Sequence, residues 1–373
     1  MKTEELIKLT LHEHPCPRIL EDLALSLKYH TIAKKNDVSF IETYSTSFFP
    51  RLISNKFKNE FCLIWDNHFW DLYERFLLAI KKIESNEMND ITSYDFFMSV
   101  YSIFLSTKFY KEPFISLVFA KYYAATGFFV PPYHIENTTI PNLHLNNAAT
   151  WLEYSKHFVF FHEIQHARYQ QKKEERLSDI ALIKSECEAL QKSSLPVETK
   201  DLIQDLLDMN DEYLLEELCC DVNSICTVCY LISNNGSYSK DIAEDVIKSI
   251  RFMTLFINDL KRIEIVYQQY YKENDVDTLK SSAFKNSIIE KETRNFVVFF
   301  IARRLMGFNS ELNSDSAFFL NDDMFNRYLR PYSDILDVEF IKNISEKAKF
   351  YSQIFSPTEC SISRDIIIGW HKK

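Results

Sequence analysis

The pentapeptide His162-Glu163-Ile164-Gln165-His166 combines two metal-binding side chains with an acidic one at helical spacing. Residues four apart lie on the same face of a helix, so His162 and His166 can direct their imidazoles to one point. Zn²⁺ binds neutral imidazole nitrogens at about 2.0–2.1 Å, and two of them fill two corners of a tetrahedron. Glu163 is rotated by about 100° from His162, so it can reach a metal-bound water without binding the metal. The spacing predicts a zinc site with an acid–base residue.

The residues around the pentapeptide favour one continuous helix. No Pro or Gly interrupts residues 151–170, and a Val-Phe-Phe run directly precedes His162. Two histidines and a glutamate at this spacing also arise by chance in a chain with 10 His. A pair of core or surface histidines without a metal therefore stays open as the alternative.

The third metal ligand has to come from another part of the chain, because a catalytic zinc site uses three protein ligands and keeps one position open. After His166 the next histidine is His371. The third ligand is then a carboxylate or a thiolate, unless an upstream histidine takes part. Our candidate is Glu217, because Asp221 follows one helical turn later and can accept the free ring N–H of a ligating histidine.

Two adjacent glutamates compete for this position on the helix predicted at 212–232. Glu217 has apolar neighbours on its side of the helix, namely Leu214, Leu218 and Ile225. Glu216 lies about 100° around the helix and has polar neighbours, namely Glu212 and Asn223. We therefore expect Glu217 to be partly buried and to bind the metal, and Glu216 to be solvated.

The two helices together resemble the site of the glutamate-zincins, metallopeptidases with a thermolysin-like site that pair a His-Glu-x-x-His helix with a Glu-x-x-x-Asp helix. The matching residues here are His162-Glu-Ile-Gln-His166 and Glu217-Leu-Cys-Cys-Asp221. The resemblance implies a zincin-like core in which His162, His166 and Glu217 bind Zn²⁺. It also implies that Glu163 is the general base and that Asp221 orients His162. The resemblance covers two helices, and the longer segment between them leaves the subfamily open.

The cysteines of the same helix offer a competing interpretation. Cys226 and Cys229 form a Cys-x-x-Cys pair, but inside a predicted helix they lack the turn that structural zinc sites use, and no second pair follows at zinc-finger spacing. We expect these thiols, with Cys219 and Cys220, to be small buried side chains.

Composition indicates a helix-rich fold. The chain has 373 residues, of which 46% are hydrophobic, and only 4 are Gly. Turn-dense β folds rely on glycine, so we expect an α+β protein that is predominantly helical, with a zincin-like core, a small sheet and additional helices.

The charge pattern excludes several classes of partner. The net charge is −10 and no basic stripe is present, so we expect no nucleic-acid binding. The most apolar window, 114–133, contains Lys121 and ends in Pro131-Pro132, so it is a poor membrane span. The amino terminus lacks the apolar core of a signal peptide, and we therefore expect a cytoplasmic protein whose cysteines are free thiols or ligands rather than disulfides.

The order of elements suggests three regions. We expect an N-terminal helical segment at 1–54, a zincin-like catalytic core at 55–235 and a C-terminal helical region at 236–373. Residues 1–58 are predicted as helices and loops, and residues 61–65 as a buried strand followed by a helix. Two extended, Pro-broken segments are expected at 128–136 and 138–145. Further helices are predicted at 93–106, 147–173, 174–192, 198–209, 212–232, 242–273 and 279–306.

The function that these residues predict is zinc-dependent hydrolysis of a peptide bond in a peptide or protein substrate, with Glu163 as general base. Two alternatives remain open. One is a zincin-shaped protein that binds a partner without turnover. The other is an all-helical interaction protein in which the pentapeptide is accidental.

Overall fold

The computed structural model describes residues 20–43, 49–55, 60–84, 104, 142–195, 197–233, 239–273, 297–308 and 346. Within these residues the chain is mostly helical and has one small sheet. The elements in chain order are α2 (Leu20–Lys35), β1 (Val38–Thr43), β2 (Arg51–Asn55), β3 (Glu60–Asp66), α3 (Asn67–Glu84), α6 (Asn142–Gln171), α7 (Lys173–Gln191), α8 (Val197–Met209), α9 (Glu212–Ile232), α10 (Lys240–Glu273) and α12 (Val298–Leu305).

The predicted α+β class, predominantly helical with a small sheet, is confirmed in the described residues. Strand β3 and helices α3, α7, α8, α9 and α10 lie where the sequence pattern placed them. Caps fix two of these starts. Asp66 Oδ1 accepts a hydrogen bond from the backbone N–H of His68 at 3.2 Å, and Asp211 Oδ1 accepts one from the backbone N–H of Tyr213 at 2.8 Å.

Two parts of the sequence prediction are wrong. Residues 1–58 were expected to form helices and loops, but β1 and β2 lie within them. Helix α6 begins at Asn142, so residues 142–145 are helical rather than extended. The segment predicted as extended at 128–136 and nearly all of the helix predicted at 93–106 lie outside the described residues, as does the first part of the helix predicted at 279–306. The three-region division stays a prediction, although β2 spans its boundary at 54–55.

The sheet has the strand order β1-β3-β2. Strand β1 runs parallel to β3, and the edge strand β2 runs antiparallel to it, with Leu52 opposite Leu63. Alternation along the strands sends Phe40, Leu63 and Trp65 to one face. That face is continuous with the main core, whereas Ile41, Cys62 and Ile64 form a smaller cluster on the other face, with Ile53 packed against it.

Helices α2 and α6 cover the main-core face of the sheet through aromatic contacts. Tyr29 of α2 stacks on Phe160 of α6 with ring centroids 4.1 Å apart, and Tyr29 also meets Trp65 of β3 at 5.3 Å. Both Tyr29 and Phe160 are almost completely buried. Helix α6 is thereby fixed against the sheet only two residues before His162.

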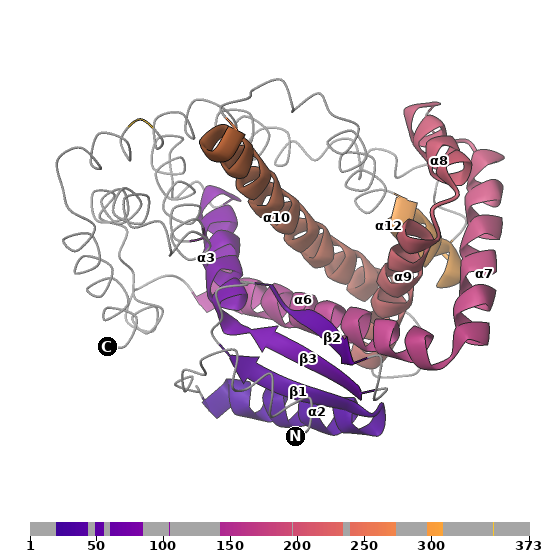
Figure 1. The fold of residues 1–373 in the computed structure, drawn as a ribbon. Helices are drawn as coiled ribbons and strands as arrows, with labels where there is room; N and C mark the ends of the chain where they lie inside the picture. The colour runs from indigo at the N-terminus through magenta and orange to yellow at the C-terminus, as the bar shows by residue number, and fades with distance from the viewer. Residues whose placement is uncertain are drawn as a thin grey trace.

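Helix α6 links the sheet to the rest of the helices. Figure 1 shows it running along the sheet and continuing toward α9, and it packs against α3, α9 and α10 as well as against β2 and β3. Helix α9 in turn packs against α7, α10 and α12. None of the described helices has the length and apolar character needed to cross a lipid bilayer.

The aromatic stack predicts which side chain anchors α6. Phe160→Ala should lower the free energy of unfolding by about 3–5 kcal/mol, because it leaves a cavity between α6, α2 and the sheet. Leu27→Ala on α2 is the matched control: Leu27 is 59% exposed, so its loss should change stability by less than about 0.5 kcal/mol. Urea unfolding of both variants measures the difference, and equal midpoints would contradict this account of the core.

Candidate metal centre

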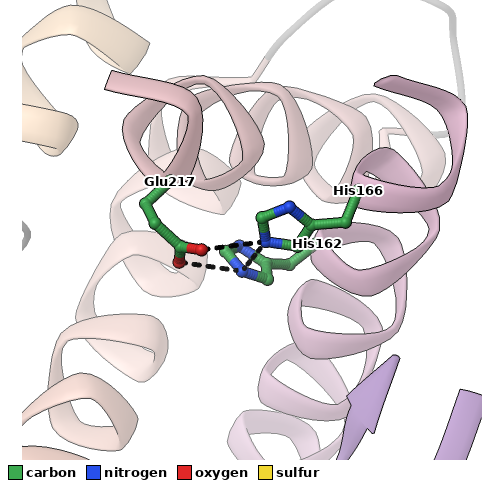
Figure 2. Close-up of side chains that lie close together, drawn as sticks. All are labelled: His162, His166 and Glu217. Atoms are coloured by element: carbon green, nitrogen blue, oxygen red, sulfur yellow. Dashed lines mark hydrogen bonds and ion pairs between the residues drawn. The ribbon is translucent and has the colours of Figure 1, made fainter. Parts of the chain in front are cut away.

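Three side chains from two helices converge on one point. Helix α6 contributes His162 and His166, one turn apart, and α9 contributes Glu217 (Figure 2). The two imidazole Nε2 atoms are 3.1 Å apart. Glu217 Oε1 lies 3.1 Å from His166 Nε2, and Glu217 Oε2 lies 3.5 Å from His162 Nε2. His162 and Glu217 are each only 7% exposed.

These separations are those of ligands around a small cation. For bonds of about 2.1 Å in a tetrahedral zinc site, the ligand atoms are about 3.4 Å apart. The three distances of 3.1, 3.1 and 3.5 Å lie close to that value. Two nitrogens and a carboxylate oxygen are also a donor set that zinc accepts in catalytic sites. The residues therefore fit a metal ion in both spacing and donor type.

The far nitrogens of both imidazoles face carboxylates, which fixes the direction of the lone pairs. His162 Nδ1 lies 2.8 Å from Asp221 Oδ1. His166 Nδ1 lies 3.1 Å from Glu216 Oε1 and donates a hydrogen bond to it. A carboxylate keeps the proton on the Nδ1 atom that faces it, so each neutral imidazole has its lone pair on Nε2. Both lone pairs then point at the Glu217 carboxylate.

A cluster of lone pairs and a carboxylate is stabilised by a positive charge. Burial opposes the protonation of His162, but its contacts with Asp221 outweigh burial and raise its pKa above 6.5. Burial also opposes the protonation of His166, whose pKa is raised by contacts with Cys220 and Glu216. Two imidazolium ions at this separation repel each other. One divalent cation supplies the same charge without that repulsion.

Glu163 lies beside the cluster rather than within it. Its Oε2 accepts a hydrogen bond from the backbone N–H of Leu52, on edge strand β2, at 2.8 Å. Burial raises the pKa of Glu163 above its ordinary value of 4.5, although the nearby charges of His162 and His166 act in the opposite direction. A partly buried carboxyl group with a raised pKa, next to a candidate metal position, has the properties of an acid–base residue.

The structure brings together all five residues named by the sequence pattern. His162, His166 and Glu217 converge, Asp221 faces the far nitrogen of His162, and Glu163 adjoins them. The expectation that Glu216 is solvated is wrong. Its side chain is only 17% exposed and lies between His166 and Arg176 of α7. Helix α7 packs on α9 and covers Glu216. The pattern of residues along α9 carries no information about that packing.

Sequence reasoning missed two further residues of this region. Arg176 bonds to Glu216 through its Nε at 2.6 Å, and Leu52 holds Glu163 through its backbone. Arg176 is one cation among many in a charged helix, so its type and position gave no signal. The contact from Leu52 is made by a main-chain group, which every non-proline residue carries.

The cysteines of α9 do not join the metal cluster. Within the described ranges, the group of His, Cys, Asp and Glu side chains that could hold a metal ion consists of His162, His166 and Glu217. Cys220 Sγ lies 3.6 Å from His166 Nδ1, the nitrogen that faces away from the cluster. Burial raises the pKa of Cys220, Cys226 and Cys229 to about 12, so these thiols stay protonated. They are free and largely buried, as predicted.

Comparison with protein-family models, with curated proteins and with solved structures found no match. The similarity to glutamate-zincins therefore rests on α6 and α9 alone.

Removing one converging side chain should abolish metal binding. We expect the purified chain to bind about one Zn²⁺, and Glu217→Ala to lose more affinity than the roughly 10–100-fold that follows loss of a supporting residue. Glu188→Ala, at an exposed position of α7, is the matched control and should bind zinc normally. Elemental analysis and competition with a chromophoric chelator measure both. Zinc retention by Glu217→Ala would remove Glu217 from the site.

Zinc affinity should also fall as the pH falls. The metal and protons compete for the same Nε2 lone pairs, and the pKa values of both imidazoles are raised in the metal-free protein. The competition should therefore already operate above the ordinary histidine pKa of about 6.5. Chelator competition at several pH values between about 6 and 8 should show affinity rising with pH, with proton release on binding. An affinity independent of pH over this range would contradict ligation by these imidazoles.

Proposed function

We propose that this protein is a zinc-dependent metallopeptidase that hydrolyses peptide bonds. The observation that carries the proposal is the convergence of His162, His166 and Glu217, with both imidazole lone pairs directed at the same point. An accidental His-Glu-x-x-His sequence gives no reason for a carboxylate from a distant helix to complete the cluster. The three-stranded sheet shows that the chain is not all-helical, but an interaction protein with an accidental pentapeptide stays open as the alternative.

The proposed ligands leave room for chemistry. Three protein ligands are the number found in catalytic zinc sites, which keep a fourth position for water or substrate. When bound there, Zn²⁺ would lower the pKa of a coordinated water and polarise a substrate carbonyl. Asp221 and Glu216 hold the two imidazoles with their Nε2 atoms directed at that position.

Glu163 is the proposed general base. It follows His162 in sequence, so it lies beside the ligand face of α6 without belonging to it. Its raised pKa, caused by burial, brings the carboxyl group closer to the pH at which a base both accepts and returns a proton efficiently. Glu163 would take a proton from the attacking water and return it to the leaving amine.

Edge strand β2 supports a peptide as the substrate class. Since the Leu52 N–H bonds to Glu163, it points away from β3 and toward the outer side of the sheet. In an antiparallel pair, residues two apart direct their backbone groups to the same side, so those of Ser54 also point outward. Extended peptides bind to such strand edges through main-chain hydrogen bonds. Among the described strands, β2 is at the edge of the sheet, so its remaining outward backbone groups could bind an extended peptide beside the proposed base.

Glu163→Gln tests the catalytic part of the proposal. The variant should keep zinc, because Glu163 is not one of the converging ligands, and should lose roughly 10²–10⁴-fold in turnover. Zinc content and hydrolysis of a broad mixture of quenched fluorescent peptides measure the two effects. Full activity in the variant would exclude Glu163 as base.

A second outcome of the same assay separates catalysis from binding. If the zinc-loaded wild-type chain cleaves no peptide in the mixture, the peptidase proposal is contradicted, and a metal-containing binding protein becomes the better description. The matched control is Glu153→Gln, which lies on the same helix with a side chain 58% exposed and should leave both zinc content and hydrolysis unchanged.

A further inference from the structure

Two charged side chains, Arg176 of α7 and Glu216 of α9, connect α7 to the candidate metal ligand His166. His166 Nδ1 donates to Glu216 Oε1 at 3.1 Å, and Arg176 Nε donates to the other oxygen, Oε2, at 2.6 Å. The terminal nitrogens of Arg176 reach Glu212 Oε2 at 3.3 and 3.4 Å. One guanidinium thus bridges two carboxylates that lie one turn apart on α9.

We propose that Arg176 and Glu216 form a positioning pair that orients His166 for metal binding, so that α7 is part of the metal centre although it supplies no ligand. This inference depends on the metal site of the proposed function and adds to it a third helix. The pair gives His166 a carboxylate behind its far nitrogen, as Asp221 gives His162.

Arg176 is needed because Glu216 has two oxygens and a flexible side chain. A carboxylate held by one hydrogen bond rotates freely, whereas the planar guanidinium fixes Oε2 and leaves Oε1 directed at the imidazole. The positive charge also compensates a second carboxylate directly adjacent to Glu217. Arg176 bonds to Glu216 and Glu212 but not to His166, so we expect its loss to affect the orientation of His166 through Glu216.

A second link between α7 and the metal helices provides a control of the same construction. Asp179 Oδ2 accepts hydrogen bonds from Tyr169 of α6 at 2.6 Å and from Asn223 of α9 at 3.0 Å. This link joins the same three helices one turn further along α7, but it contacts none of the proposed ligands. If α7 merely braces the helices, breaking either link should weaken the metal site similarly.

The experiment compares zinc affinity across variants of the full chain. Glu216→Ala should weaken zinc by roughly 10–100-fold, the usual cost of losing a residue that supports a ligating histidine. Glu216→Gln keeps an oxygen acceptor and should recover part of that loss. Arg176→Ala should weaken zinc less than Glu216→Ala. Chelator competition measures the affinities, and the visible spectrum of the Co²⁺-substituted protein reports the ligand geometry.

Two further variants distinguish positioning from bracing. Adding Arg176→Ala to Glu216→Ala should weaken zinc no further, because both changes act on the same contact to His166. Tyr169→Phe removes the hydroxyl of the second link and should leave zinc affinity and the Co²⁺ spectrum unchanged, even where thermal unfolding shows a loss of stability.

Several results would overturn the inference. They are wild-type zinc affinity in both Glu216→Ala and Arg176→Ala, additive losses in the double variant, or an equal loss in Tyr169→Phe. If the Ala variants fail to fold, Glu216→Gln and Arg176→Lys carry the same comparison. If the wild-type chain binds neither zinc nor cobalt, the proposed metal centre itself is contradicted. That outcome is distinct from the results above, which contradict only the role of α7.

Discussion

The arrangement depends on an electrostatic constraint between α6 and α9. Their packing brings two imidazole lone pairs and the carboxylate of Glu217 together in a nearly buried position. Such a group of electron-pair donors is unfavourable without a cation, because burial removes the water that would otherwise solvate it. The carboxylates of Asp221 and Glu216, which face the Nδ1 atoms of the two histidines, add further negative charge to this region. Positive charge at this interface would therefore stabilise the packing of the two helices.

The sheet contributes to the same region by fixing α6 along its length. Phe160 is buried against Tyr29 and the strands, and Glu163, three residues later, bonds to the backbone of β2. Helix α6 therefore makes three different contacts. Its aromatic side chains pack on the sheet, Glu163 bonds to the edge strand β2, and the two histidines face α9. The periodicity of 3.6 residues separates these three functions around a single helix.

The sequence predicted those parts of the site that depend on local spacing. His162 and His166 lie on one regular helix and Glu217 and Asp221 on another, so the relative directions within each pair follow from residue number. What depends on packing between distant segments was not predictable. The burial of Glu216 is created by α7, and β1 and β2 were missed because short strands carry little periodic signal before a partner pairs with them. The neighbouring proline favours an extended prediction for residues 142–145, whereas these residues form the first turn of α6.

The position of the ligands along the chain has a consequence for folding. His166 and Glu216 are 50 residues apart, and α7 and α8 fill the interval before the adjacent ligand, Glu217. An ion held by α6 and α9 would close that interval into a loop and act as a cross-link. By loop-closure arithmetic, a cross-link over this length removes about 4 kcal/mol of chain entropy from the unfolded state at 25 °C. Binding of an ion by α6 and α9 would then also stabilise α7 and α8, which supply no ligand, against unfolding.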